Sequence, residues 1–370
     1  MPPVIYGLIA LFGQFRFRKR FMDAIPMLAV LMLCWNAIDA PDNDSYMRAY
    51  NNLEREKYYR GFGIGFKLVI NVFRSLGFNY RFFKLFIVLI TLVITEIVLI
   101  YLTADSWLVW SYYLAFPALY TYIQIRNALA LSIVAAGLAI IVKHVKYGEL
   151  YCMLCIAVAY TIHSTCVLFF VIPVLSMFAE RTVAIVASVI AVLNFLTMPV
   201  LPQFAALLFS QKKVNYYMID NAADPLDRVL ITVTVLLNIA VLLYIRWRSA
   251  EHTPEFDAVF KISLAFLSLL PVLMYNKDFL RLDRVIVLFV YVAMANYFVR
   301  FEQRIEMQSR RIEAESSLCV VVRHERMRYW AERFSAMLVP VYLFMYLVFP
   351  AIRQLPAEVF GSPLLLSWSN

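Results

Sequence analysis

Residues 106–142 read SWLVWSYYLAFPALYTYIQIRNALALSIVAAGLAIIV, and Arg126 is the only charged side chain among them. At about 1.5 Å of rise per residue, one helix of this length would far exceed a hydrocarbon core of roughly 30 Å. The helix must therefore break, and the only strongly polar place for a break is around Gln124, Arg126 and Asn127. A guanidinium in or beside a membrane usually faces a protein interior, a water-filled cavity or an anion. The stretch therefore predicts a polar cavity around Arg126.

The composition of the whole chain is that of a helical membrane protein. Of its 370 residues, 63% are hydrophobic and only 16% are charged, and the mean hydropathy is +0.72. The apolar residues fall in many long blocks separated by clusters of charge, more than one soluble core would need. We therefore predict an all-α fold, a polytopic membrane protein that forms a single integral membrane domain over residues 1–370.

The positions of the apolar blocks predict about 12 transmembrane segments. They lie at about 3–15, 22–38, 82–103, 107–123, 128–142, 149–162, 164–179, 182–198, 228–245, 259–275, 284–300 and 335–350. Short clusters rich in Lys and Arg mark the cytoplasmic side of a membrane protein. With twelve spans, all such clusters fall on one side, namely 16–20, 143–146, 246–248 and 300–334. This count divides 149–179 into two spans that turn near Thr161–Ser164 on the outer side.

Three segments between the spans have a character of their own. The outer loop 39–81 contains an amphipathic helix at 66–76, which we expect to lie at the membrane interface. A second outer loop spans 199–227. The segment 300–334, rich in Arg and Glu, is predicted to be a solvated, membrane-lying helix held by salt bridges. The net charge of +9 is assigned mainly to the cytoplasmic face and anionic lipid headgroups, so nucleic acid is not an expected partner.

Gln124, Arg126 and Asn127 form the first candidate site. The helix that follows the break is expected to start near Asn127. A helix N-terminus and a guanidinium both supply N–H donors and positive potential, which suits a phosphate or diphosphate. The alternative is an arginine that snorkels to the interface or pairs with a carboxylate.

His163 is the second candidate, at the predicted outer turn and on the same side as Arg126. Near neutral pH, an imidazole can act as general base for a hydroxyl nucleophile. The alternative is a hydrogen-bonded packing residue. No metal-ligand spacing surrounds His163, so a bound metal is not indicated. No cofactor is expected. The Cys152–Cys155 pair is interpreted as packed thiols.

Carboxylates and an aromatic residue that could bind sugar follow the second span. Asp42 and Asp44 offer bidentate acceptors for sugar hydroxyls, and Tyr46 offers a flat apolar face. The alternative is a turn and helix N-cap. Arg284, at a predicted outer helix end, is a weaker candidate for substrate binding, because Asp283 beside it could simply neutralise an arginine.

Four motifs in this order resemble the EpsG-like branch of the Wzy-type bacterial polysaccharide polymerases. They are Asp42 to Tyr46, Gly61-Phe62 leading to Gly77-Phe78, the run Ile125-Arg126-Asn127-Ala128-Leu129-Ala130, and His163-Ser164. The resemblance covers mainly residues 1–180. One departure is Arg60, which stands before Gly61-Phe62 where the family usually has a glutamate.

The resemblance implies a GT-C-like, Wzy-like membrane fold and a glycosyltransferase of the bacterial plasma (inner) membrane, with its active site facing the periplasm. The enzyme would join undecaprenyl-diphosphate-linked oligosaccharide repeats by moving the growing chain onto an acceptor repeat. Arg126 would bind the diphosphate, His163 would deprotonate or orient the acceptor, and Asp42, Asp44 and Tyr46 would hold sugar. The expected partners are the lipid-linked donor and acceptor and the bilayer, and a chain-length regulator is a further candidate.

Two other functions fit a chain with twelve spans. A lipid-linked oligosaccharide flippase or transporter predicts functional charges at the midplane and cavities open alternately to both sides, whereas the motifs here lie toward one side. An O-antigen ligase or another polyprenyl-phosphate-dependent glycosyltransferase would use the same donor chemistry with a different acceptor.

Overall fold

The computed structural model shows a helical protein in two compact units. It describes residues 3–15, 20–36, 42–52, 61–197, 200, 202–203, 206, 211–220, 222–249, 253–312 and 319–343. Every regular element among these residues is a helix, which confirms the predicted all-α class. The first unit comprises 1–129 and 291–370, and the second comprises 130–290.

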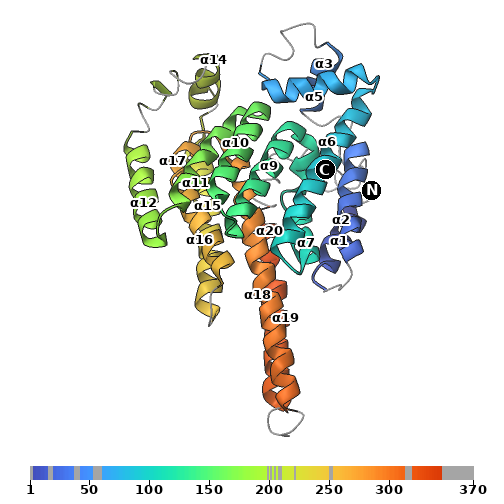
Figure 1. Cartoon of the computed structure of the whole chain (residues 1–370), viewed down its shortest axis with the longest axis vertical. Helices are drawn as coiled ribbons and strands as arrows, with labels where there is room; N and C mark the ends of the chain where they lie inside the picture. The colour runs from blue at the N-terminus through green and yellow to red at the C-terminus, as the bar shows by residue number, and fades with distance from the viewer. Residues whose placement is uncertain are drawn as a thin grey trace, which may run out of the picture. The chain divides into compact units, whose positions relative to one another are not determined.

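The first unit is built from the N-terminal helices and the end of the chain. Its helices are α1 (Pro3–Phe12), η1 (Arg20–Asp23), α2 (Ala24–Asn36), α3 (Asn43–Asn51), α5 (Ile64–Ser75), α6 (Tyr80–Leu102), α7 (Ser106–Ala115), α8 (Ala118–Ile123), the start of α9 (Ile125–Val142), most of α18 (Asp283–Ile312), α19 (Cys319–Ala336) and α20 (Leu338–Leu343). Helices α2, α6, α7 and α8 pack against one another. Figure 1 shows α3 and α5 lying across one end of α6.

Local sequence explains how α5 gives way to α6. Gly77 adopts a left-handed conformation with φ of 76°, and the amides of Gly77 and Phe78 donate to the carbonyls of Arg74 and Phe73. Glycine favours this conformation because it has no Cβ to clash with the backbone. The Asn79 side chain then caps α6 by accepting from the amide of Phe82 at 3.0 Å. The chain can therefore turn from the crosswise α5 into the long α6.

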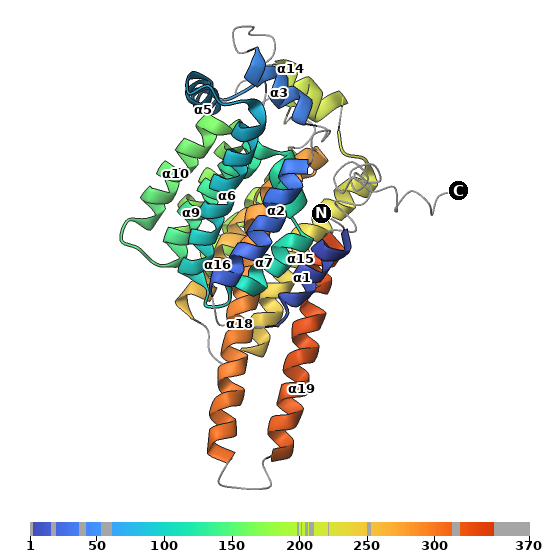
Figure 2. The same ribbon diagram turned by 90° about the vertical axis from the view of Figure 1, so that its right-hand side faces the viewer.

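At the other end of the first unit, α18 and α19 run side by side as an antiparallel pair (Figure 2). Tyr297 of α18 donates to Glu332 of α19 at 2.7 Å. Arg328 pairs with Glu332 at 3.0 Å and with Glu325 at 3.4 Å. The salt bridges predicted for 300–334 are therefore present, but the prediction of one helix is wrong, because the segment forms parts of α18 and α19, and the rings of Phe301 and Tyr329 pack 5.7 Å apart between these two helices.

A buried ion pair joins α19 to the N-terminal helices of the first unit. Arg333 is fully buried, and its Nη2 lies 3.0 Å from Oδ2 of Asp105, which caps α7. The same guanidinium donates to the carbonyl of Gln14 at 2.7 Å and to the hydroxyl of Tyr329 at 2.8 Å. Buried charges persist only when they are paired and hydrogen bonded, and here every contact is made within one unit.

The second unit contains the middle of the chain. Its helices are the remainder of α9, α10 (Gly148–Ile162), η2 (Ser164–Phe170), α11 (Val171–Ser176), α12 (Glu180–Leu196), α14 (Gln211–Val214), the π-helical η4 (Asn215–Asp220), α15 (Pro225–Arg248), α16 (Pro254–Leu267), α17 (Leu270–Leu273), η5 (Lys277–Leu282) and the start of α18. Helix α10 packs against η2 and α11, and α16 packs against α11, α12 and α15. The predicted division of 149–179 into two segments is confirmed.

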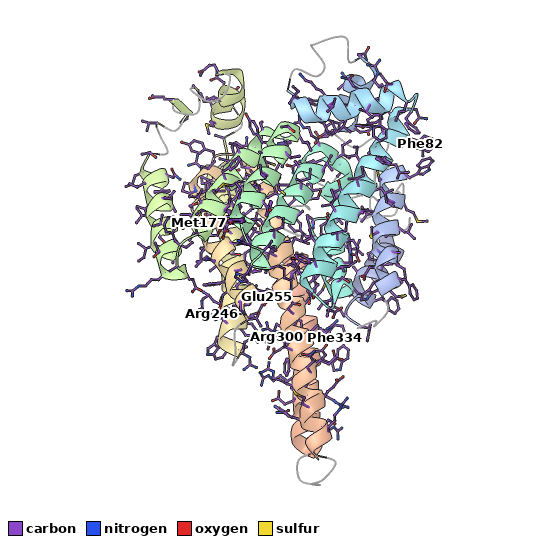
Figure 3. The ribbon with its side chains drawn as sticks, in the orientation of Figure 1. Phe82, Met177, Arg246, Glu255, Arg300 and Phe334 are labelled. Carbon is purple, nitrogen blue, oxygen red and sulfur yellow. The ribbon has the colours of Figure 1, made fainter. Side chains whose placement is uncertain are left out.

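Ion pairs gather at one end of the second unit. Lys143, at the end of α9, lies 3.6 Å from Glu255 in the first turn of α16. Arg246, near the end of α15, pairs with Glu180 at 2.5 Å. Figure 3 shows Arg246 and Glu255 at the same end of the helices α15 and α16. Two of the predicted cytoplasmic clusters, 143–146 and 246–248, thus contribute to one end of this unit.

Four helices among the described residues are long and apolar enough to cross a membrane. They are Tyr80–Leu102, Ile125–Val142, Pro225–Arg248 and Asp278–Arg310. The predicted span 107–123 is interrupted at Pro117, and 259–275 is interrupted after Leu267. Proline disrupts a helix because it lacks an N–H donor and clashes with the preceding turn. Of the predicted loops, 37–41, 53–60 and most of 198–210 lie outside the described residues.

Candidate anion and sugar site at the break between α8 and α9

The predicted helix break is present at Gln124. Helix α8 ends at Ile123, Gln124 has the non-helical angles φ −105° and ψ 56°, and α9 begins at Ile125. The expected start near Asn127 is therefore two residues late, since the carbonyl of Gln124 already accepts from the amide of Ala128 at 2.9 Å. Arg126 and Asn127 consequently lie in the first turn of α9, where backbone amides have no acceptor within the helix.

Arg126 contacts the Gly61-Phe62 pair. Its Nη1 donates to the carbonyl of Gly61 at 3.0 Å, and its guanidinium carbon lies 4.7 Å from the centre of the Phe62 ring. The side chain is half-buried. Neither contact is with a carboxylate, so the positive charge is held by a carbonyl and a π-face. The guanidinium thus keeps the capacity to bind an anion.

Buried polar atoms without partners surround this break. Asn127 is 1% exposed, and both its Nδ2 and its Oδ1 have no hydrogen-bond partner among the described residues. Nε of Arg126 and Oε1 of Gln124 are likewise buried and unpartnered there. A buried polar group without a partner destabilises a fold by about 1–3 kcal/mol. Three adjacent side chains with such atoms are typical of a site that a ligand completes.

Tyr46 joins the same cluster through aromatic contacts. Its ring centre lies 5.7 Å from that of Phe62 and 6.1 Å from that of Phe66, and the latter two rings are 5.6 Å apart. Phe62 therefore contacts both Tyr46 and Arg126. The structure brings together two predicted site residues, Tyr46 and Arg126, that stand 80 positions apart in the chain.

The carboxylates of the predicted sugar motif are placed differently from Tyr46. Asp44 is exposed and pairs with Arg48 at 3.5 Å, one turn along α3. Asp42 occupies the N-cap position of α3, as the alternative interpretation predicted, but its side chain makes no capping hydrogen bond. The buried polar residue of the motif is Asn43, whose Oδ1 accepts from the hydroxyl of Tyr80 at 2.8 Å. Asp42 and Asp44 stay predictions for sugar binding.

Tyr50, on the next turn of α3, ties this helix to the turn before α6. Its hydroxyl donates to the carbonyl of Phe78 at 2.6 Å. Burial raises the pKa of Tyr50 above its ordinary value of 10, and the positive charge of Arg74 offsets part of that rise. The phenol therefore remains protonated at neutral pH and keeps donating. This hydrogen bond fixes α3, and with it Tyr46, over the end of α6.

The amphipathic helix predicted at 66–76 is observed as α5. One side buries Phe66 and Ile70 against the protein. The opposite side exposes Ile64, Leu68 and Val72, which stand four residues apart and so form one stripe. An apolar stripe of this kind suits the membrane interface, as the sequence predicted.

His163 lies in the second unit, between α10 and η2. It is buried, and its extended backbone, with φ −138° and ψ 113°, ends α10. Nδ1 lies 2.6 Å from the hydroxyl of Thr165. A ring that donates from Nδ1 to this hydroxyl presents Nε2 as its basic nitrogen. The position at a turn is confirmed, and the roles of base and packing residue both remain compatible with this contact.

Arg284 lies in the first turn of α18, also in the second unit, and is half-buried. Its neighbour Asp283 is buried and accepts from Nδ2 of Asn238 at 2.9 and 3.1 Å. Arg281 pairs with Asp278 at 2.9 Å. Asp283 is therefore held by an amide, and the ion pair of Arg281 is with another carboxylate.

Sequence reasoning missed two contributors to the first unit. Phe62 was named only as part of a motif. The pattern of hydrophobic residues does not indicate that its ring contacts Arg126. Glu96 lies within the α6 span and accepts from Nε1 of Trp110 at 2.6 Å. A carboxylate inside a predicted span was a signal that could have identified it.

The Cys152–Cys155 pair packs closely against α9 in the second unit. A Cβ on Gly137 would lie 2.9 Å from Cβ of Cys155 and 3.1 Å from Cα of Cys152. Cys152 is fully buried. The interpretation as packed thiols is therefore supported by helix contact. In the described part of the chain, no group of three or more His, Cys, Asp or Glu side chains is arranged to hold a metal ion.

Comparison with known proteins adds one finding to this geometry. A sequence model described as the EpsG family matches residues 5–322. The match extends well beyond 1–180, where the quoted motifs lie. No curated protein and no solved structure matches the chain. Together with the apolar helices, the family match indicates a membrane location and a role in polysaccharide biosynthesis.

Proposed function

The chain belongs to the EpsG family, and on this premise we propose that it is a polysaccharide polymerase with undecaprenyl-diphosphate-linked oligosaccharide repeats as substrates. It acts on the outer face of the bacterial plasma membrane and uses a Wzy-like, GT-C-like arrangement of about twelve crossings. The four long apolar helices supply some of these crossings, and shorter helices such as α10 supply others. The proposal needs no nucleotide-sugar site and no cofactor.

The proposed reaction is a glycosyl transfer. An acceptor hydroxyl oxygen bonds to the anomeric carbon of the growing chain, and the bond from that carbon to the diphosphate oxygen breaks. The bonding electrons leave with the undecaprenyl diphosphate, and the hydroxyl proton passes to a base. The enzyme must therefore stabilise negative charge on the leaving diphosphate and hold a base at the acceptor.

The observation that carries this proposal is the cluster of unpartnered polar atoms at the break between α8 and α9. Arg126 and the first amides of α9 can donate to the diphosphate, because both supply N–H groups in the first turn of the same helix. Tyr46 and Phe62 would present ring faces to sugar. In this proposal His163 acts as the base, Asp42 and Asp44 bind sugar hydroxyls, and Arg284 contacts the substrate.

The test incubates the purified protein with a synthetic lipid-diphosphate oligosaccharide, with and without a chelator, and follows the product ladder on a gel. We expect wild-type protein to form a ladder under both conditions. Arg126→Ala should abolish it or lower the rate by at least about a hundredfold, as expected for a lost charge contact to the leaving group. A ladder of unchanged length and rate with Arg126→Ala would contradict the assignment.

A matched control is Arg81→Ala in the same unit. Like Arg126, Arg81 stacks on an aromatic ring, 3.8 Å from the centre of Trp35, and donates to a backbone carbonyl at 3.0 Å. It lies in the first turn of α6, on a different helix from Arg126. The control therefore removes the same kinds of contact without touching the proposed diphosphate site, and its ladder should match that of the wild type.

A further inference from the structure

The break between α8 and α9 presents unsatisfied acceptors as well as unsatisfied donors. On the donor side are Nε of Arg126 and Nδ2 of Asn127, and on the acceptor side are Oδ1 of Asn127 and Oε1 of Gln124. All four atoms are buried and have no partner among the described residues. The Asn127 acceptor remains even if its amide is rotated by 180°, because both atoms of that amide are unpartnered.

A diphosphate alone cannot satisfy this set. The diphosphate bridging a lipid and a sugar is fully ionised at neutral pH, so it offers only acceptor oxygens. It would pair with the Arg126 and Asn127 donors and leave the carbonyl oxygens of Gln124 and Asn127 without a hydrogen. Buried acceptors left in this state weaken binding. A ligand that fills the site must therefore bring an O–H or N–H close to its phosphate.

In a glycosyl diphosphate, the group nearest the phosphate that carries such a hydrogen is the substituent at C2 of the first sugar. We infer that the break between α8 and α9 recognises the junction of sugar and diphosphate, with Arg126 at the phosphate and the amides of Gln124 and Asn127 at the C2 hydroxyl or acylamino N–H. This inference rests on the proposed function and deepens it. Asn127 and Gln124 would thereby determine which donor sugar is accepted.

The test measures binding of short-chain analogues to the full-length protein in detergent by calorimetry. The probes are farnesyl diphosphate without sugar and farnesyl diphosphate linked to a hexose, a 2-acetamido hexose or a 2-deoxy hexose. We expect wild-type protein to bind one of the first two glycosides about tenfold to a hundredfold more tightly than the 2-deoxy hexose. Whichever binds more tightly identifies the C2 group as hydroxyl or acylamino.

Asn127→Leu provides the matched variant. It should bind all three glycosides with equal affinity, and its affinity for farnesyl diphosphate should fall less than that of Arg126→Ala, because only the Asn127 donor is lost and Arg126 remains. Its melting temperature without ligand should rise, since a buried amide without partners is replaced by an apolar side chain of similar size. Gln124→Leu should reduce the discrimination in the same direction.

The outcomes separate the inference from the proposed function. If wild-type protein makes a ladder but binds the 2-deoxy glycoside as tightly as the others, the inference is wrong and the polymerase stands. The inference is also wrong, and the polymerase again stands, if Asn127→Leu discriminates as well as wild-type protein. If no farnesyl diphosphate compound binds and Arg126→Ala leaves the ladder unchanged, the diphosphate site is wrong and the inference falls with it, whereas wild-type protein that makes no ladder overturns the proposed function.

Discussion

Replacing Arg333 with methionine removes the cation of a buried ion pair and should strongly destabilise the first unit. The guanidinium is fully buried, lies 3.0 Å from the Asp105 carboxylate, and donates to Gln14 and Tyr329. Methionine fills much of the volume but leaves the Asp105 carboxylate, itself 1% exposed, without its partner. Breaking one side of a buried pair costs about 3–5 kcal/mol, so we expect the free energy of unfolding to fall by that amount.

The control is Arg328→Met, five residues earlier on α19. Its pairs with Glu325 and Glu332 are about one-third exposed at the arginine, where solvent weakens the attraction. We expect a loss below about 1 kcal/mol. Unfolding in mixed micelles, followed by the fluorescence of the nearby Trp330, measures both variants under the same conditions.

A double-mutant cycle completes this test. Asp105→Asn keeps a side-chain oxygen that can cap α7 but removes the charge, so on its own it leaves Arg333 unpaired. Combined with Arg333→Met, it should restore part of the stability, with a coupling energy of at least about 2 kcal/mol. Additive effects in the cycle, or a loss for Arg333→Met no larger than that for Arg328→Met, would refute the reasoning.

Three further predictions concern both units. Gly137→Ala should lower the melting temperature, because the added Cβ would overlap atoms of α10. Gly7→Ala has open space around the added Cβ, so it should increase the free energy of unfolding by up to about 1 kcal/mol and raise the melting temperature. A backbone hydrogen bond and Lys143 lower the pKa of Glu255 below its ordinary value of 4.5, against the opposing effect of burial. Because the pKa of Glu255 is lower in the folded state, the ionised Glu255 stabilises the fold above pH 4.5, and this stabilisation is lost as the pH falls below that value. In a series of melting temperatures measured at different pH, Glu255→Gln should therefore show a smaller decrease on the acid side than wild-type protein. Phe62→Leu should weaken farnesyl diphosphate binding less than Arg126→Ala does, because only the stacking contact is lost.

Much of the helical architecture could be predicted from the sequence because the membrane imposes simple limits on length and polarity. The long uncharged stretch 106–142 had to break, and Gln124 is where it does. The amphipathic pattern of α5 and the turn at His163 were likewise legible in the chain. Pro117, where the predicted span 107–123 is interrupted, lies in the same stretch. Mean hydropathy over a window is little changed by one proline, so α7 and α8 were predicted as a single span.

The pairings within the candidate site could not be predicted in the same way. Phe62 stands between Tyr46 and Arg126 because α5 lies across the end of α6, and that crossing depends on Gly77 and on packing. The hairpin of α18 and α19 escaped prediction for a related reason. A run of Arg and Glu has the same composition in one solvent-exposed helix and in two helices that pack against each other with their charges beside the contact. Composition therefore does not distinguish the two arrangements.

The sequence alone therefore determined that this protein is helical, lies in a membrane and breaks one helix at a cationic motif, since hydrocarbon thickness and charge burial act on local composition. Only the tertiary structure decided which groups each of the two arginines contacts among the described residues. Arg333 meets a buried carboxylate from a distant helix, while Arg126 meets a carbonyl and a ring. The physical reason is that pairing depends on which helix ends meet, since Asp105 and Gly61 each lie more than 60 residues along the chain from the arginine they contact.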